Sequence, residues 1–176
     1  MKKFNIVVAI DKNNGIGKSG HLPWHISADL KYFKQVTTFV LNKGASNAVI
    51  MGRKTWESIP KNFQPLKDRI NVVLTRNNNL KLPKDVLNAN GLDEALKILE
   101  NKGVDNIFVI GGQQVYEQAI EHKACEKLYI TRIDQTFDCD AHFPKFDDRF
   151  YLVLESPQIK SADISFKFLI YKKCSN

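Results

Sequence analysis

The chain has 176 residues, of which 43% are hydrophobic and 26% charged, a balance that excludes intrinsic disorder and suits one globular domain. No apolar run approaches the roughly 18 residues that a membrane helix needs, and the apolar run at the N-terminus meets Asp11 without a signal-peptide cleavage site. The net charge is +7, with basic residues spread along the chain, so we expect small anions such as dinucleotides as ligands rather than nucleic acid or a membrane.

The cysteines and histidines argue against a disulfide framework and against a metal. Cys125, Cys139 and Cys174 form an odd count without the spacing of metal ligands. They fit reduced thiols, and we therefore predict a cytoplasmic protein. The four histidines are scattered and lack Cys or Glu partners at ligand spacing, so no metal site is expected.

Strand and helix patterns alternate through most of the chain. Residues 4–10 (FNIVVAI) predict a central strand that is buried on both faces, and residues 11–20 predict a polar, glycine-rich loop that is a candidate lid or a plain surface loop. The alternation up to about residue 130 predicts a mostly parallel sheet in a single domain spanning 1–176. The later elements are expected as strand 48–51, helix 53–59, strand 70–75, strand 86–89, helix 92–102, strand 106–110, helix 113–121, strand 127–133 and a closing hairpin of 150–156 with 164–172.

Residues 21–33 (HLPWHISADLKYF) place one acid, Asp29, inside an apolar and aromatic run. Ser27 is a plausible helix N-cap, which puts Asp29 in the first turn. The acid is then either a solvated carboxylate that the helix dipole favours or a pocket acid that faces a ligand, and spacing alone favours the solvated interpretation. The buried face of this helix is predicted to carry Leu30, Phe33, Val36 and Thr37.

Three strand ends offer hydrogen-bond donors to an anion. Gly111-Gly112 joins a strand directly to a helix, where backbone N–H groups can approach a phosphate. Alone this is weak, because such turns are as often only tight connections, and a Rossmann fingerprint is missing. Gly52 to Thr55 and Leu74 to Arg76 lie at two other strand ends, and parallel strands place such ends on one edge. Two arginines and a lysine there favour a dinucleotide with an extra phosphate.

Taken together, these segments resemble the dihydrofolate reductase family from about residue 4 to the C-terminus. The resemblance implies an α/β fold with a central eight-stranded, mostly parallel sheet, an antiparallel C-terminal strand and helices on both faces. It also implies a monomer that reduces 7,8-dihydrofolate to 5,6,7,8-tetrahydrofolate by hydride transfer from NADPH. The shared motifs are Val8-Ala9, GIG at 15–17, LPW at 22–24, ADL at 28–30, VIMGRKTWESIP at 49–60, PLKDRINVVLTR at 65–76, IGG at 110–112, Val115-Tyr116, YITRI at 129–133 and DAHFP at 140–144.

The resemblance also implies roles for individual residues. Asp29 would bind the pterin with Thr131 behind it and assist protonation of N5, and a water near Leu22 and Trp24 would donate the proton. Arg69 would hold the glutamate α-carboxylate of the substrate. The remaining pocket walls would be Val7, Ala9, Leu30, Phe33, Ile59, Leu66, Ile110 and Tyr116. The contacts of NADPH would be Ala9, Ile16, Gly17, Gly52, Arg53, Lys54, Thr55, Leu74, Thr75, Arg76, Gly111, Gly112, Gln113, Gln114, Val115 and Tyr116.

Further expectations come from the same resemblance. Residues 11–24 would be the lid, steadied by the loop around Asp140; Gly111–Gly112 would be a cis peptide; and Arg53 and Arg76 would flank the 2′-phosphate. The acid is Asp29 where vertebrate members carry Glu, so affinities for antifolates do not transfer. Three alternatives stay open: a reductase of this fold that acts on a riboflavin precursor, a catalytically silent homologue, and a basic nucleic-acid-binding protein.

Overall fold

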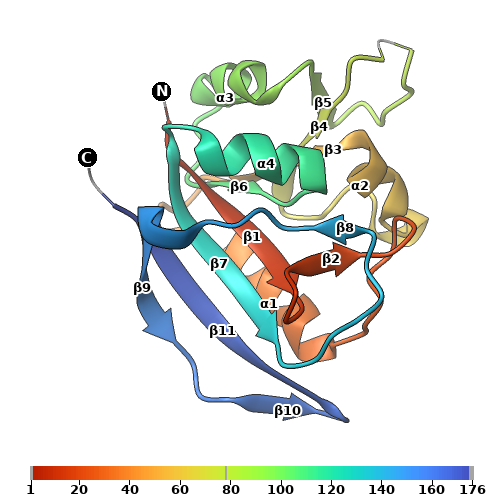
Figure 1. The fold of residues 1–176 in the computed structure, drawn as a ribbon. Coiled ribbons are helices and arrows are strands. Elements are labelled where there is room, and N and C mark those ends of the chain that lie inside the picture. The colour runs from red at the N-terminus through yellow and green to blue at the C-terminus, as the bar shows by residue number, and fades with distance from the viewer. Residues whose placement is uncertain (1, 78, 175–176) are drawn as a thin grey trace.

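The computed structural model describes residues 2–77 and 79–174, and its centre is a twisted sheet with helices on both faces (Figure 1). The sheet strands are β1 (Phe4–Ile10), β3 (Asn47–Gly52), β4 (Arg69–Leu74), β5 (Val86–Ala89), β6 (Ile107–Val109), β7 (Cys125–Ile133), β9 (Phe150–Glu155), β10 (Ile159–Ser161) and β11 (Ile164–Lys173). The helices are α1 (Ser27–Thr38), α2 (Arg53–Ser58), α3 (Leu92–Glu100) and α4 (Gln113–Glu121).

The strand order is β10-β11-β7-β1-β6-β3-β4-β5, with β9 also paired to β11. The pairs from β7 to β5 are parallel, whereas β11 runs antiparallel to β7. β10 pairs with the start of β11 and β9 with its end, so these two strands share the outermost position. The prediction of an eight-stranded, mostly parallel sheet with an antiparallel C-terminal strand is therefore confirmed, with the eighth position divided between two strands.

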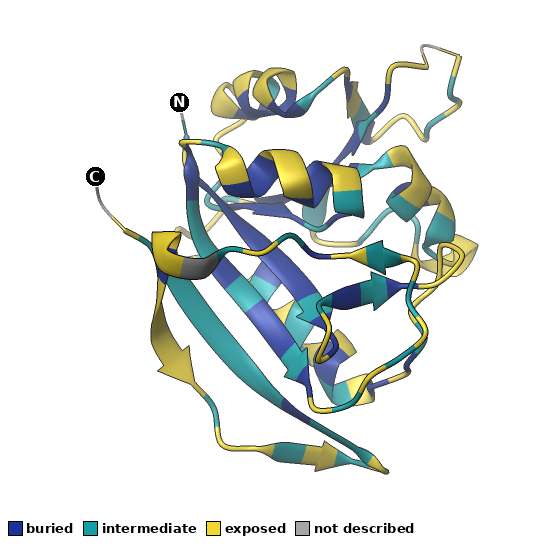
Figure 2. Ribbon diagram, in the orientation of Figure 1, coloured by how far each residue is buried: buried dark blue, intermediate teal, exposed yellow. Residues whose placement is uncertain are grey.

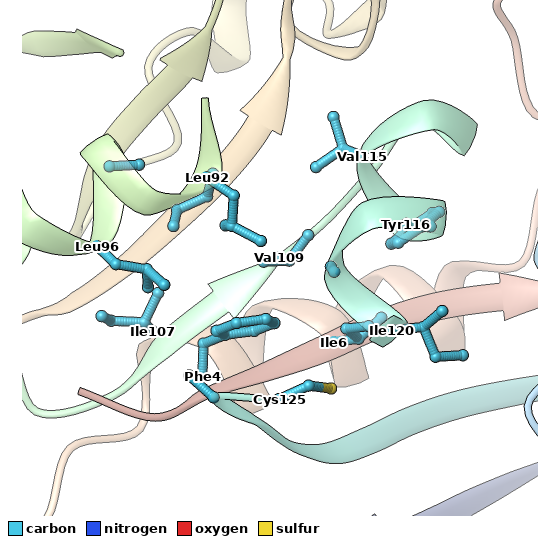
Figure 3. Packing of buried hydrophobic residues seen from close by; sticks show 14 of the residues in the cluster. Phe4, Ile6, Leu92, Leu96, Ile107, Val109, Val115, Tyr116, Ile120 and Cys125 are labelled. Carbon is cyan, nitrogen blue, oxygen red and sulfur yellow. The ribbon is translucent and has the colours of Figure 1, made fainter. Parts of the chain in front are cut away.

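Alternate residues of β1 enter two cores, one on each face of the sheet. Ile6 and Val8 join a large core with α3 and α4, in which side chains of β1, β6 and both helices meet (Figure 3). Val7 joins a smaller core on the other face with Trp56 of α2 and Phe33 of α1. Burial on both faces explains why β1 is a nearly continuous apolar run, and Figure 2 shows it buried while the outer sides of α3 and α4 are exposed.

Two predictions about α1 are wrong. Ile26, and not Ser27, holds the N-cap position, and no side chain caps the helix. Leu30 is 46% exposed, although Thr37 is buried and Phe33 and Val36 are half-buried. The reason is that Asp29, and not Leu30, faces the sheet in the first turn, where Thr131 of β7 donates to it, and adjacent helix positions do not share a face.

Three strands, β2 (Gly15–Gly17), β8 (Ala141–His142) and β10, were missed because they are three residues or shorter. β2 lies inside the predicted loop 11–20 and pairs with β8. The register is Gly15↔His142 and Gly17↔Ala141, so the paired residues are 124 to 127 positions apart in the chain. β10 lies inside the predicted closing hairpin, which is itself confirmed by the β9–β11 pairing. Pairings across such distances depend on tertiary contacts that a local pattern does not contain.

Three further observations concern membrane-spanning helices, groups of metal-binding side chains and the cysteines. Within residues 2–77 and 79–174, no helix combines the length and apolar character of a membrane span. The same residues hold no group of three or more His, Cys, Asp or Glu side chains placed to bind a metal ion. Cys125, Cys139 and Cys174 are free thiols.

Candidate active site

The carboxylate of Asp29 is buried in the first turn of α1. Its side chain meets β7, where Thr131 Oγ1 donates a hydrogen bond of 2.6 Å to Asp29 Oδ1, and the residue is only 8% exposed. Burial raises the pKa of Asp29 above its ordinary value, and the hydrogen bond from Thr131 acts in the lowering direction. The solvated interpretation of this acid is therefore wrong, because Asp29 is buried and hydrogen-bonded to Thr131.

Trp24 precedes this acid by five residues, in the chain segment that leads into α1. Its indole is buried in a small cluster with Ile26 and Phe166 and contacts the ring of Phe137, with 5.2 Å between ring centroids. Trp24 Nε1 is buried and has no hydrogen-bond partner among the residues that the structure describes. A buried donor without a protein partner marks a place where a ligand or an ordered water fits. Leu22, two residues earlier, is 51% exposed.

The Gly111–Gly112 peptide is cis, as the resemblance implied. Gly111 has φ +110, and a Cβ on it would lie 3.0 Å from the ring of Tyr116, while one on Gly112 would lie 3.2 Å from Thr55 Oγ1. The Tyr116 side chain is held against the turn, because its hydroxyl donates to the carbonyl oxygen of Val7 at 2.8 Å. Burial raises the pKa of this hydroxyl. The turn therefore forms a backbone cradle that any larger residue would fill.

The three strand ends with donors and cations do meet at one edge of the sheet. Gly52 at the end of β3 donates its N–H to Gly111 O at 2.7 Å and is in register with Leu74 at the end of β4. Arg53 and Arg76, which follow these two strand ends, are exposed. A glycine cradle flanked by cations at the carboxyl edge of parallel strands fits a phosphorylated dinucleotide in shape and in charge.

Arg69 lies at the opposite end of β4, beside α1. Its Nη1 donates to Thr37 Oγ1 at 2.7 Å, and its guanidinium carbon is 5.7 Å from the centre of the Phe33 ring. Burial lowers the pKa of Arg69, although the guanidinium remains a cation at neutral pH. A planar cation that neighbouring side chains hold in place suits a carboxylate ligand.

The predicted lid segment, residues 11–24, is held at its start and again in its interior. Asp11 is fully buried, and its carboxylate accepts hydrogen bonds from the backbone N–H groups of Asn13 (2.8 Å), Gly15 (2.6 Å) and Phe137 (2.9 Å). Further along, Ser19 N donates to Asp140 Oδ2 at 2.9 Å, and Figure 1 shows β2 lying against β8. The loop around Asp140 thus contacts the lid as expected. Asp11 was not predicted as a site residue. The available signal was that it is an isolated acid directly after an apolar strand.

The other expected site residues fall into separate surroundings. Phe33, Ile59, Leu66 and Ile110 are half-buried and pack around the core that contains Val7. Ala9 packs against the Trp24 cluster, whereas Ile16 and Val115 belong to the core on the opposite face. Gln113 is hydrogen-bonded to Glu117 and to His142 N. Lys54 and Gln114 are exposed, Thr55 is half-buried, Thr75 is buried, and Gly17 lies in β2.

An α/β sheet with glycine turns and cations at its carboxyl edge, together with a buried carboxylate, is the arrangement expected of an α/β oxidoreductase. More narrowly, the chain belongs to the dihydrofolate reductase family, whose model matches residues 3–173. The dihydrofolate reductases of Heliothis virescens and Drosophila melanogaster are similar to it, with 40% and 42% identity over 97% and 99% of this chain and 97% and 100% of theirs. Schistosoma mansoni dihydrofolate reductase has a similar solved structure, with TM-score 0.86, 39% identity and coverage of 98% of this chain and 99% of that one.

Proposed function

We propose that this protein reduces 7,8-dihydrofolate to 5,6,7,8-tetrahydrofolate by hydride transfer from NADPH. The observation that carries the proposal is the buried Asp29–Thr131 pair, in a chain that belongs to the dihydrofolate reductase family. A buried, hydrogen-bonded acid with a perturbed pKa is typical of a functional site. Monomeric state and a cytoplasmic location remain predictions.

Asp29 would hold the pterin ring through its N3 and 2-amino groups. As an anion, the carboxylate favours a protonated pterin, while Thr131 keeps one carboxylate oxygen hydrogen-bonded and fixes the orientation of the group. Since Asp29 would not lie beside N5, a water close to Leu22 and Trp24 would deliver the proton. The partnerless Nε1 donor of Trp24 supports a water or substrate atom at that place.

Arg69 would orient the substrate by its glutamate tail. Its guanidinium lies over Phe33 and is hydrogen-bonded to Thr37, so an approaching α-carboxylate would meet a cation with restricted motion. The half-buried apolar side chains around Val7 would contact the rest of the substrate and exclude water from it.

The chain's residues would hold NADPH along the carboxyl edge of the sheet. Gly52, Gly111 and Gly112 allow close approach of the backbone, and a Cβ on Gly52 would lie only 3.1 Å from Val115 Cγ2. Arg53 and Arg76 would meet the 2′-phosphate, while Ala9 leaves a thin wall where two flat rings stack. When bound, NADPH supplies the hydride, and the protein's contribution is to position the two rings at roughly 3–3.5 Å.

A single assay tests the proposal. Purified protein with dihydrofolate should consume NADPH, which is followed by loss of its absorbance, and the Asp29→Asn variant should be slower. A catalytically silent homologue would bind NADPH without consuming it. A reductase of riboflavin precursors would consume NADPH only with that class of substrate. Either result would refute the proposed reaction.

A further inference from the structure

The cation that opens α2 is already paired with an acid. Both Oε atoms of Glu57 lie 2.8 Å from Arg53 Nη1, one helical turn further along α2. The two side chains are 43% and 46% exposed, so the pair is accessible to a ligand. Among the described residues, the two other cations expected at this edge, Lys54 and Arg76, have no such carboxylate partner.

The backbone fixes Arg53 at the cofactor edge. Arg53 directly follows Gly52, whose N–H is bonded to Gly111 O and which is in register with Leu74. The position of the Arg53 Cα therefore depends on the sheet edge, whereas the position and effective charge of its guanidinium depend on Glu57. A substitution at Glu57 can thus change the position and effective charge of the guanidinium without moving the backbone of the Gly111–Gly112 turn.

We propose that Glu57 is a specificity residue which weakens recognition of the 2′-phosphate of NADPH by neutralising Arg53. This inference rests on the proposed function, because that function places the phosphate beside Arg53. Both contacts of Glu57 use the same nitrogen, so Nε and Nη2 of Arg53 are left to a phosphate. The phosphate then meets a cation whose charge is already balanced, and a carboxylate that repels it.

The size of the effect follows from the exposure of the pair. An exposed ion pair changes an equilibrium by at most about fivefold, and repulsion between the carboxylate and the phosphate adds to this. The Glu57→Gln variant should bind NADPH about three- to tenfold more tightly. NADH has no 2′-phosphate, so its dissociation constant should change less than twofold. Glu57 would therefore lower the preference for NADPH over NADH without touching the nicotinamide.

The test is a titration of the full chain with NADPH, NADH and 2′-AMP, followed by quenching of protein fluorescence or by calorimetry. 2′-AMP carries the phosphate without the nicotinamide and should follow NADPH. The Glu126→Gln variant is the matched control, because it removes the same charge from an ion pair with Lys3 at the opposite edge of the sheet. Glu126→Gln should leave all three dissociation constants unchanged, and 1 M salt should shrink the effect of Glu57→Gln.

A double-variant cycle identifies the path of the effect. After Arg53→Ala, the further change Glu57→Gln should tighten NADPH clearly less than it does in the unmodified chain, because only the direct repulsion between carboxylate and phosphate is then relieved. The inference is overturned if Glu57→Gln leaves the affinity for NADPH unchanged, or if the affinities for NADPH and NADH change equally. It is also overturned if Glu57→Gln weakens the binding of NADPH, which would mean that Glu57 orients Arg53 for the phosphate. These outcomes are distinct from failure of the proposed function, in which the unmodified protein would not consume NADPH with dihydrofolate.

Discussion

Thr131 donates its hydroxyl proton to Asp29 across 102 positions of the chain, and this 2.6 Å hydrogen bond joins β7 to the first turn of α1. The bond offsets part of the effect of burying the carboxylate, since burial raises the pKa of Asp29 and the bond acts to lower it. Both residues are therefore suitable positions for tests of the site.

Asp29→Asn should slow turnover of dihydrofolate by about 10²–10⁴-fold, because the amide is nearly isosteric but cannot pair as an anion with a protonated pterin. Lower pH should restore part of the loss, since the solvent then protonates more substrate. The hydride-transfer rate against pH is the measurement. Unchanged kinetics of the Asp29→Asn variant would show that Asp29 has no role in the reaction.

The same variant should change the pH dependence of stability. A carboxyl whose folded pKa is raised binds its proton more tightly in the native state, so its contribution is favourable at low pH and is lost as pH rises through the folded pKa. Asp29→Asn should therefore hold or raise the free energy of unfolding at neutral pH and flatten its fall with pH. Denaturant unfolding of both proteins across this range gives the comparison.

Thr131→Val removes the hydroxyl that bonds Asp29 and keeps the shape of the side chain. The pKa of Asp29 should rise further, and leaving the carboxylate without this donor should cost roughly 1–3 kcal/mol at a pH where it is ionised. The pH–rate profile should move toward higher pH. Thr131→Ser keeps the donor and is the control, and a serine variant that behaves like the valine variant would contradict this explanation.

Arg76→Ala should weaken NADPH about ten- to a hundredfold, because a hydrogen bond to a charged group is worth roughly 1.5–3 kcal/mol. NADH, which lacks the 2′-phosphate, should bind as before. Dissociation constants of the two cofactors are compared on the same protein preparation. Equal weakening of both would show that Arg76 does not contact the phosphate.

Gly111→Ala should disrupt both the turn and cofactor binding, since the added Cβ would lie 3.0 Å from the Tyr116 ring at a φ of +110. Gly44→Ala is a matched control, because Gly44 also has positive φ (+87) but a Cβ there meets nothing within 4 Å. The control should cost only the backbone penalty of about 1–2 kcal/mol. Thermal unfolding and NADPH titration of the two variants separate crowding from backbone strain.

Asp11→Asn should loosen the lid and cost about 1–3 kcal/mol of stability, because one of its two acceptor oxygens becomes an amide donor facing a backbone N–H. The three N–H groups that Asp11 binds belong to Asn13, Gly15 and Phe137, so both loops should lose protection. Hydrogen exchange of residues 11–24 is the direct measurement. Unchanged exchange would show that β2–β8 pairing holds the lid by itself.

Local patterns predicted the elements that bury apolar residues at a regular period. β1, α4 and β5 have the predicted bounds, because each is a strong local signal between clear turns. The N-cap at Ser27, the burial of Leu30 and the β2–β8 pair failed because each depends on contacts between distant segments.

The site was predicted less from periodicity than from ordered family motifs. Spacing alone favoured a solvated Asp29, which is wrong, since only folding brings Thr131 to it and buries it. Motifs gave Arg53 and the Gly111–Gly112 turn as cofactor residues. They gave no sign that Glu57 would pair with Arg53, because an acid one turn away on a helix is also common on an ordinary solvated surface.

The position of β11 between β7 and the β9–β10 edge has a consequence for protein synthesis. Residues 127–133 of β7 pair with 166–172 on one side, so that edge has no partner until β11 leaves the ribosome. The strand that carries Thr131 is thus exposed while most of the chain has already been made, and unpaired strand edges are prone to aggregation. Nascent chains halted before residue 164 should therefore bind chaperones that protect extended segments, and release of β11 should end that dependence.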